Sequence, residues 1–158
     1  MSDLRPVTVA VAVLGLFAGG LAALGRFLPF VLDRPQEGQV AVAVAVVDGL
    51  AFLLSPVAVA IVGYGAGSRV DVGEAYGRIV AIFAGVGGAA SLVGGAAMTF
   101  GLADPIARAS VLDLGLTFVF APISIGVSFA LAGLAAAAVA QFRQEDEDVR
   151  EFHEDGGR

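Results

Sequence analysis

Four long apolar segments, separated by short polar stretches, dominate the pattern of hydrophobic and polar positions along the chain. A membrane-spanning helix needs about 20 mostly apolar residues. Four segments reach that length, at residues 7–25, 40–66, 79–103 and 111–140. The third segment contains no charged residue at all. The pattern therefore predicts an all-α, polytopic membrane protein with four spans.

The polar stretches between these segments are short, at residues 26–39, 67–78 and 104–110. Short connections force consecutive helices to lie antiparallel, so we expect an up-down-up-down four-helix transmembrane bundle. Residues 1–140 would form this domain, and residues 141–158 a separate tail. The first segment could instead be a signal peptide. However, Arg-Phe-Leu-Pro-Phe follows it where a small-residue cleavage site should stand, so we expect a retained span.

The distribution of arginine predicts the orientation in the membrane. Cytoplasmic connections carry an excess of basic residues. The N-terminus, the second connection and the tail fall on one side of the predicted bundle and carry six of the nine arginines. The opposite side carries Arg26, Arg34 and Arg108. We therefore expect a multi-pass protein of the cell membrane with both termini in the cytoplasm.

Composition narrows the chemistry that this chain can perform. It is 58% hydrophobic, with a mean hydropathy of +0.87, and it contains no cysteine and no lysine. The only histidine, His153, lies in the tail, so a multi-histidine metal site and a Ser–His pair within the membrane are both excluded. The net charge of −6, with arginines dispersed, argues against nucleic-acid binding. We expect no enzyme activity, no cofactor and no metal.

An internal repeat emerges when the sequence is shifted by 66 residues. Gly-Leu-Ala-Phe-Leu-Leu-Ser-Pro at 49–56 then matches Gly-Leu-Thr-Phe-Val-Phe-Ala-Pro at 115–122. This match suggests two repeated helical hairpins, although coincidence between two apolar helices is the alternative. It places Pro56 and Pro122 within the second and fourth spans, where proline removes a backbone donor and kinks a helix.

Charged residues within the spans are the candidate intramembrane polar site. Asp48 lies in the second span, and a carboxylate there should face protein or water because it is costly in lipid. Arg26 and Arg108 are its expected partners on that side of the membrane. Asp113 starts the fourth span, where it is better explained as a capping residue after Ser110. Asp48 is thus either a proton or cation site or a structural partner of arginine.

Small residues recur at four-residue intervals within the spans. Such stripes let helix backbones approach closely, which drives helix association in lipid. They predict that the third span is central to the bundle. The residues expected at helix contacts are Gly15, Gly19, Gly63, Gly67, Gly87, Ser91 and Gly95.

The tail carries seven acidic residues and three arginines. Together with the lysine-free spans rich in alanine, glycine and valine, and with the prolines within spans, it gives the chain a family likeness. The chain resembles the small four-span membrane proteins of unknown function found in halophilic archaea. That resemblance implies a membrane location but no substrate.

Two functions are compatible with these features. The first is a non-enzymatic membrane protein that works through helix association, as a homo-oligomer or as a subunit with other membrane proteins. The alternative is a small oligomeric transporter or channel that uses Asp48 as an intramembrane carboxylate site. The small-residue stripes favour the first function, whereas the repeat, the paired prolines and Asp48 favour the second.

Overall fold

The structure, a computed structural model, describes residues 4–31, 37–101 and 111–155, which form helices joined by a short turn at residues 68–71. The first span is α1 (Arg5–Val31). The second comprises α2 (Glu37–Phe52), the π-helical turn η1 (Leu53–Ala58) and α3 (Val59–Gly67). The third comprises α4 (Val72–Val80), η2 (Ala81–Val86) and α5 (Gly87–Gly101). The fourth comprises α7 (Val111–Gly115), η3 (Leu116–Phe120) and α8 (Ala121–Asp155).

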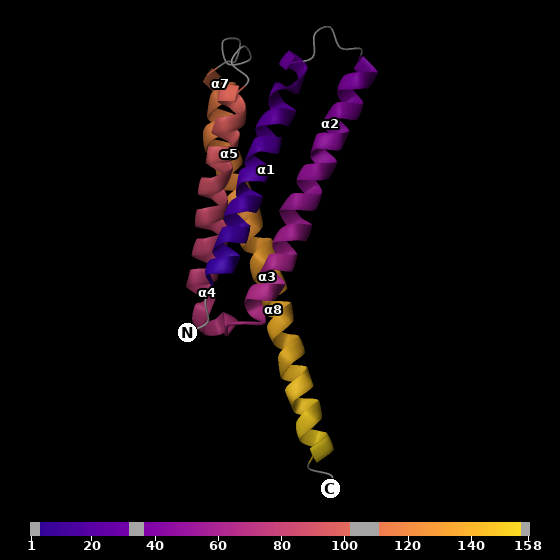
Figure 1. Cartoon of the computed structure of the whole chain (residues 1–158), viewed down its shortest axis with the longest axis vertical. Coiled ribbons are helices and arrows are strands. Elements are labelled where there is room, and N and C mark those ends of the chain that lie inside the picture. The colour runs from indigo at the N-terminus through magenta and orange to yellow at the C-terminus, as the bar shows by residue number, and fades with distance from the viewer. Residues whose placement is uncertain (1–3, 32–36, 102–110, 156–158) are drawn as a thin grey trace.

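These helices run up, down, up and down, as Figure 1 shows. Four stretches are long and apolar enough to cross a membrane: Arg5–Phe27, Ala41–Gly67, Val72–Gly101 and Leu116–Gln144. The prediction of an all-α, multi-pass membrane protein is thereby confirmed. We call the end of the bundle that carries the N-terminus, the α3–α4 connection and the α8 extension the tail end.

A wide π-helical turn accompanies Pro56 in the second span and Pro122 in the fourth. Pro56 lies inside η1, and η3 ends two residues before Pro122. Proline has no N–H, so the carbonyl four residues earlier, that of Phe52 or Phe118, loses its usual helical donor. π-helical turns shift the hydrogen-bond pattern by one residue and interrupt otherwise regular helices. The third span has such a turn without any proline, at η2.

The third span begins earlier than the hydropathy pattern predicts, because the short helix α4 continues into it without a break. Asp71 caps that helix, and its Oδ1 accepts hydrogen bonds from the backbone N–H groups of Gly73 and Glu74 at 2.7 and 3.3 Å. Such a cap satisfies N–H groups that have no partner within the helix. The polar connection thus becomes the first turn of a span.

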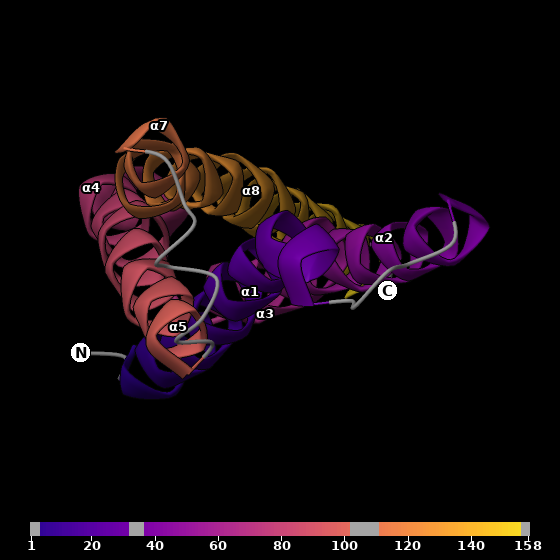
Figure 2. The same cartoon turned by 90° about the horizontal axis from the view of Figure 1, so that it is seen from above.

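The apolar core lies towards the tail end, where all four spans meet. Its largest fully buried side chains include Phe83, Phe129, Ile79, Val11 and Val59, which come from all four spans. Seen from above in Figure 2, α1, α5 and α8 form a triangle from which α2 projects outwards. Only 13% of the most apolar stretch of the second span is buried, against 28% to 39% in the other three spans.

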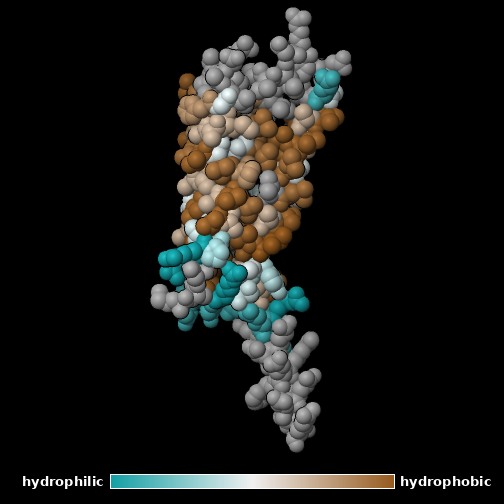
Figure 3. All heavy atoms as spheres, in the orientation of Figure 1, coloured by the Kyte–Doolittle hydropathy of each residue, from teal (hydrophilic) through white to brown (hydrophobic). Residues whose placement is uncertain are grey.

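The surface divides into an apolar belt and a polar end. Brown, apolar residues cover the bundle in Figure 3, and hydrophilic residues gather at the tail end. Side chains that would be buried in a soluble protein are exposed here, such as Ile61, Leu131 and Phe100, which are 66% to 71% exposed. A belt of this kind fits a bilayer in which the backbone hydrogen bonds are satisfied within helices.

Candidate functional site

A polar contact within the spans joins the first helix to the fourth. Arg26 is half-buried in α1, and its Nη1 donates a hydrogen bond to Thr117 Oγ1 at 3.3 Å. Thr117 belongs to the π-helical turn η3 and is only 6% exposed. An arginine near the end of a span is costly in lipid unless it reaches the interface or a polar partner. The contact therefore stabilises Arg26 and fixes two spans that are distant in sequence.

A small cavity adjoins this contact. It has a volume of about 10 Å³ and is lined by Arg26, Thr117, Ser91 and Pro122, together with small apolar neighbours. Ser91 is 1% exposed, and its Oγ donates a hydrogen bond to the Gly88 carbonyl at 2.8 Å. A cavity of this size has room for about one water molecule. The cavity can hold a water molecule beside the half-buried Arg26, but it is too small for a substrate.

The structure describes only one of the four charged residues predicted for the intramembrane polar site. Arg26 is described, whereas Arg108 and the side chains of Asp48 and Asp113 lie outside the described part of the structure. The pairing of Asp48 with Arg26 or Arg108 therefore stays a prediction. Among the described residues, no group of three His, Cys, Asp or Glu could hold a metal ion.

The predicted small residues of the first and third spans form a close, parallel helix contact. A Cβ on Gly19 would collide with the backbone of Ser91, whose Cα would be 2.6 Å away. A Cβ on Gly15 would likewise meet the Gly87 carbonyl, and Gly95 lies against the backbone of Gly19. Glycine and serine at these positions let the two backbones touch, which increases dispersion contacts between helices in lipid.

The second and fourth spans also make a close backbone contact at glycines. A Cβ on Gly63 would lie 2.8 Å from the Cα of Gly133, and one on Gly67 would lie 2.6 Å from the Cα of Ala137. Both members of each pair advance by four residues, so α3 and α8 run parallel and pack along one stripe. The two glycines leave no space between the helices for any larger side chain.

Between the third and fourth spans, a phenylalanine ring from each span packs against a glycine of the other. The ring of Phe83 from η2 fills the space beside Gly133, and the ring of Phe129 from α8 fills the space beside Gly87. Both phenylalanines are fully buried. Each ring occupies a hollow that only a glycine leaves open, so this reciprocal pair fixes the register between the two spans.

The connection between α3 and α4 is fastened to α8 by two glutamines. Gln141 Oε1 accepts a hydrogen bond from the Val72 N–H at 3.1 Å, and Gln144 Nε2 donates to the Ser68 carbonyl at 3.3 Å. With Asp71 bonded to Gly73 and Glu74, the first three N–H groups of α4 all have acceptors. The chain turns at the tail end without losing these hydrogen bonds.

Sequence reasoning missed Thr117, Gln141 and the two buried phenylalanines. Thr117 could have been noticed as a polar residue in an otherwise apolar turn, but nothing local assigns it to Arg26. Gln141 stands where the apolar run ends, which is a position that glutamine often occupies without any tertiary contact. No family model, curated protein or solved structure matches this chain. The site must therefore be interpreted from its own geometry.

Proposed function

We propose that this chain is a non-enzymatic, multi-pass membrane protein that acts through helix association, as a homo-oligomer or as a subunit of a larger membrane complex. The observation that carries the proposal is the small buried share of the second span. Its upper half, α2, packs chiefly against α1 and exposes Val42, Val46 and Leu50 on one stripe. A span with so few contacts within its own chain is suited to contact another chain.

The described polar groups support this function over catalysis. Arg26, Thr117 and Ser91 surround a volume suited to one water molecule, and their hydrogen bonds join helices. An enzyme site requires a larger pocket with several polar groups that converge on a substrate. The helix contacts, by contrast, involve all four spans, and they leave the face of α2 free.

Disulfide crosslinking in native membranes tests the proposal directly, because the chain has no cysteine of its own. Val46→Cys on α2 should give a crosslinked dimer at high salt. Val93→Cys is the matched control, since Val93 is equally exposed, at 57%, but lies on the third span. A protein that stays uncrosslinked at Val46, and that runs as a partnerless monomer in single-molecule counting, would contradict the proposal.

A small oligomeric transporter or channel is the second candidate, favoured by the charged side chain held within the first span. Under this alternative, the ion site is Asp48, a residue of α2. Asp48→Asn should then preserve folding and oligomeric state but abolish proton or cation flux into liposomes. If Asp48 is only a structural partner of an arginine, Asp48→Leu should lower thermal stability, because the arginine loses its partner. Wild-type behaviour of both variants would exclude either role for Asp48.

A further inference from the structure

An apolar groove runs along the outer side of the contact between α3 and α8. It has a volume of about 750 Å³, and its lining is apolar apart from Tyr64. Ala60 and Ala136 lie along its floor, while Ile61 and Val139 are 70% and 54% exposed and form its rims. The groove exists because Gly63 and Gly67 bring the backbones together, so that only methyl groups flank the line of contact.

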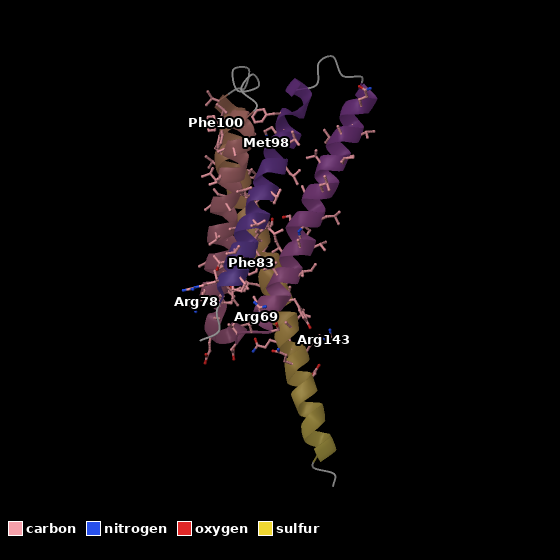
Figure 4. All side chains as sticks on the ribbon, viewed as in Figure 1. Arg69, Arg78, Phe83, Met98, Phe100 and Arg143 are labelled. Atoms are coloured by element: carbon pink, nitrogen blue, oxygen red, sulfur yellow. The ribbon has the colours of Figure 1, made fainter. Side chains whose placement is uncertain are left out.

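The groove has a polar end, and that end is the tail end. Tyr64 lies at this end and is 41% exposed. Arg143 follows Val139 by four residues on α8, so it continues the same helix face one turn beyond the groove. Figure 4 shows Arg143 projecting from α8, one residue before the fourth span ends at Gln144. Aromatic hydroxyls and arginines at this level are suited to lipid headgroups.

The width of the groove and the arginine beyond its end favour a lipid chain over another helix. A transmembrane helix is about 10–12 Å across with its side chains. A helix that packed along the furrow would meet the exposed Ile61 and Val139 side chains before it reached the alanines. A single acyl chain is thin enough to lie on the alanine floor. The charge of Arg143 then complements a phosphate at the end of that chain.

We propose that the groove between α3 and α8 binds one anionic phospholipid, with an acyl chain between Ile61 and Val139 and its phosphate on the Arg143 guanidinium. Guanidinium groups form paired, charge-assisted hydrogen bonds with phosphate oxygens. This lipid site does not involve α2 or depend on the oligomeric state. It can therefore be tested independently of the proposed helix association.

Native mass spectrometry of the full-length protein, with phosphatidylglycerol or phosphatidylcholine added in mild detergent, tests this site. One phosphatidylglycerol should remain bound in preference to phosphatidylcholine. Arg143→Gln should weaken that binding by about tenfold, the loss expected for one charge-assisted hydrogen bond. Arg78→Gln is the matched control, since Arg78 is also exposed at the tail end but lies on α4, away from the groove.

A second pair of variants tests the groove itself. Ala136→Leu places a larger side chain on the floor and should reduce lipid retention, whereas Ala89→Leu makes the same change in a separate groove between the third and fourth spans. Equal retention of phosphatidylglycerol by wild type, Arg143→Gln and Ala136→Leu would overturn the proposal. So would equal losses in the two control variants, or retention of both lipids without preference.

Discussion

The glycines of the spans fall into two kinds that composition alone cannot separate. Gly63 and Gly67 touch the backbone of α8, whereas Gly65, between them, has no atom within 4 Å of a Cβ placed on it. The first kind lets helices approach, and the second lies on an open face. Gly63 and Gly67 are spaced by four residues, the interval at which the contact stripe of a helix repeats.

Substitution of these two kinds of glycine should therefore have opposite outcomes. Gly63→Val should push α3 away from α8 and reduce stability by roughly 1–3 kcal/mol, the usual cost of overpacking. Gly65→Val, in the same helix, should have little effect because its side chain would point into open space. Thermal unfolding in detergent measures both variants. Similar melting temperatures for the two would show that the close contact does not contribute to stability.

Thr117 illustrates what the sequence could not provide at the residue scale. Its partner Arg26 is 91 positions away in sequence, and neither residue has a local pattern that indicates the other. Two polar residues in different spans can pair only if the bundle sets their depth and rotation together. The predicted partners of Arg26 were carboxylates because charge is visible in a sequence, whereas a hydroxyl acceptor gives no comparable signal.

Removal of the Thr117 hydroxyl should destabilise the bundle modestly. Thr117→Val keeps the shape but removes the acceptor for the Arg26 guanidinium, and hydrogen bonds within membrane proteins contribute about 0.6 kcal/mol on average. Thr117→Ser retains the hydroxyl and serves as the control. The free energy of unfolding in detergent or bicelles measures the difference. A Val variant as stable as the Ser variant would mean that Arg26 finds equivalent hydration elsewhere.

At the scale of elements, the predicted spans and the observed helices agree in number and order, and they differ where helix geometry is interrupted. Pro56 and Pro122 lack a backbone N–H group, and this indicates two of the interruptions in the α-helical hydrogen-bond pattern. The turn at η2 has no such signal, since Ala81–Val86 contains no proline. The insertion of the Phe83 ring beside Gly133 belongs to tertiary packing, which local preferences do not encode.

The hydrogen bonds of Gln141 and Gln144 hold the connection between α3 and α4 against α8, and their removal should affect the start of α4. Gln141→Leu removes the acceptor of the Val72 N–H, so amide hydrogen exchange at Val72 should accelerate, while the Asp71 cap still protects Gly73 and Glu74. Gln144→Leu is the control, because it removes only the bond to the Ser68 carbonyl. Hydrogen exchange resolved to single residues would distinguish them. Unchanged exchange at Val72 in the Gln141 variant would contradict this role.

For the whole molecule, hydropathy sufficed to predict the four-span bundle because the bilayer imposes a minimum length and an apolar surface on every span. It could not predict that α2 projects from the triangle of the other helices, since all four spans are similarly apolar. The sequence also does not show which residues of a span face lipid and which face another helix, because both kinds are apolar. The second span differs from the others in the smaller share of its residues that is buried in the bundle.

Orientation is the prediction that belongs to this scale. Because cytoplasmic connections favour arginine, the tail end should face the cytoplasm. Single cysteines at Ser68 and Gln39, on opposite ends of the bundle, provide the measurement in a chain that lacks cysteine. A membrane-impermeant maleimide should label Gln39→Cys in intact cells and Ser68→Cys only after permeabilisation. The reverse labelling pattern would invert the orientation without altering the four spans.

The unbroken length of α8 fixes how far its last turn is held from the membrane. The helix leaves the apolar belt near Gln144 and continues to Asp155, a further rise of about 16 Å. That height is about twice the Debye length of 8 Å at physiological ionic strength. The last turn of the helix therefore lies beyond the reach of charges at the membrane surface. The four consecutive acidic residues at 145–148, by contrast, follow directly after the end of the span and stay within about one turn of the membrane surface.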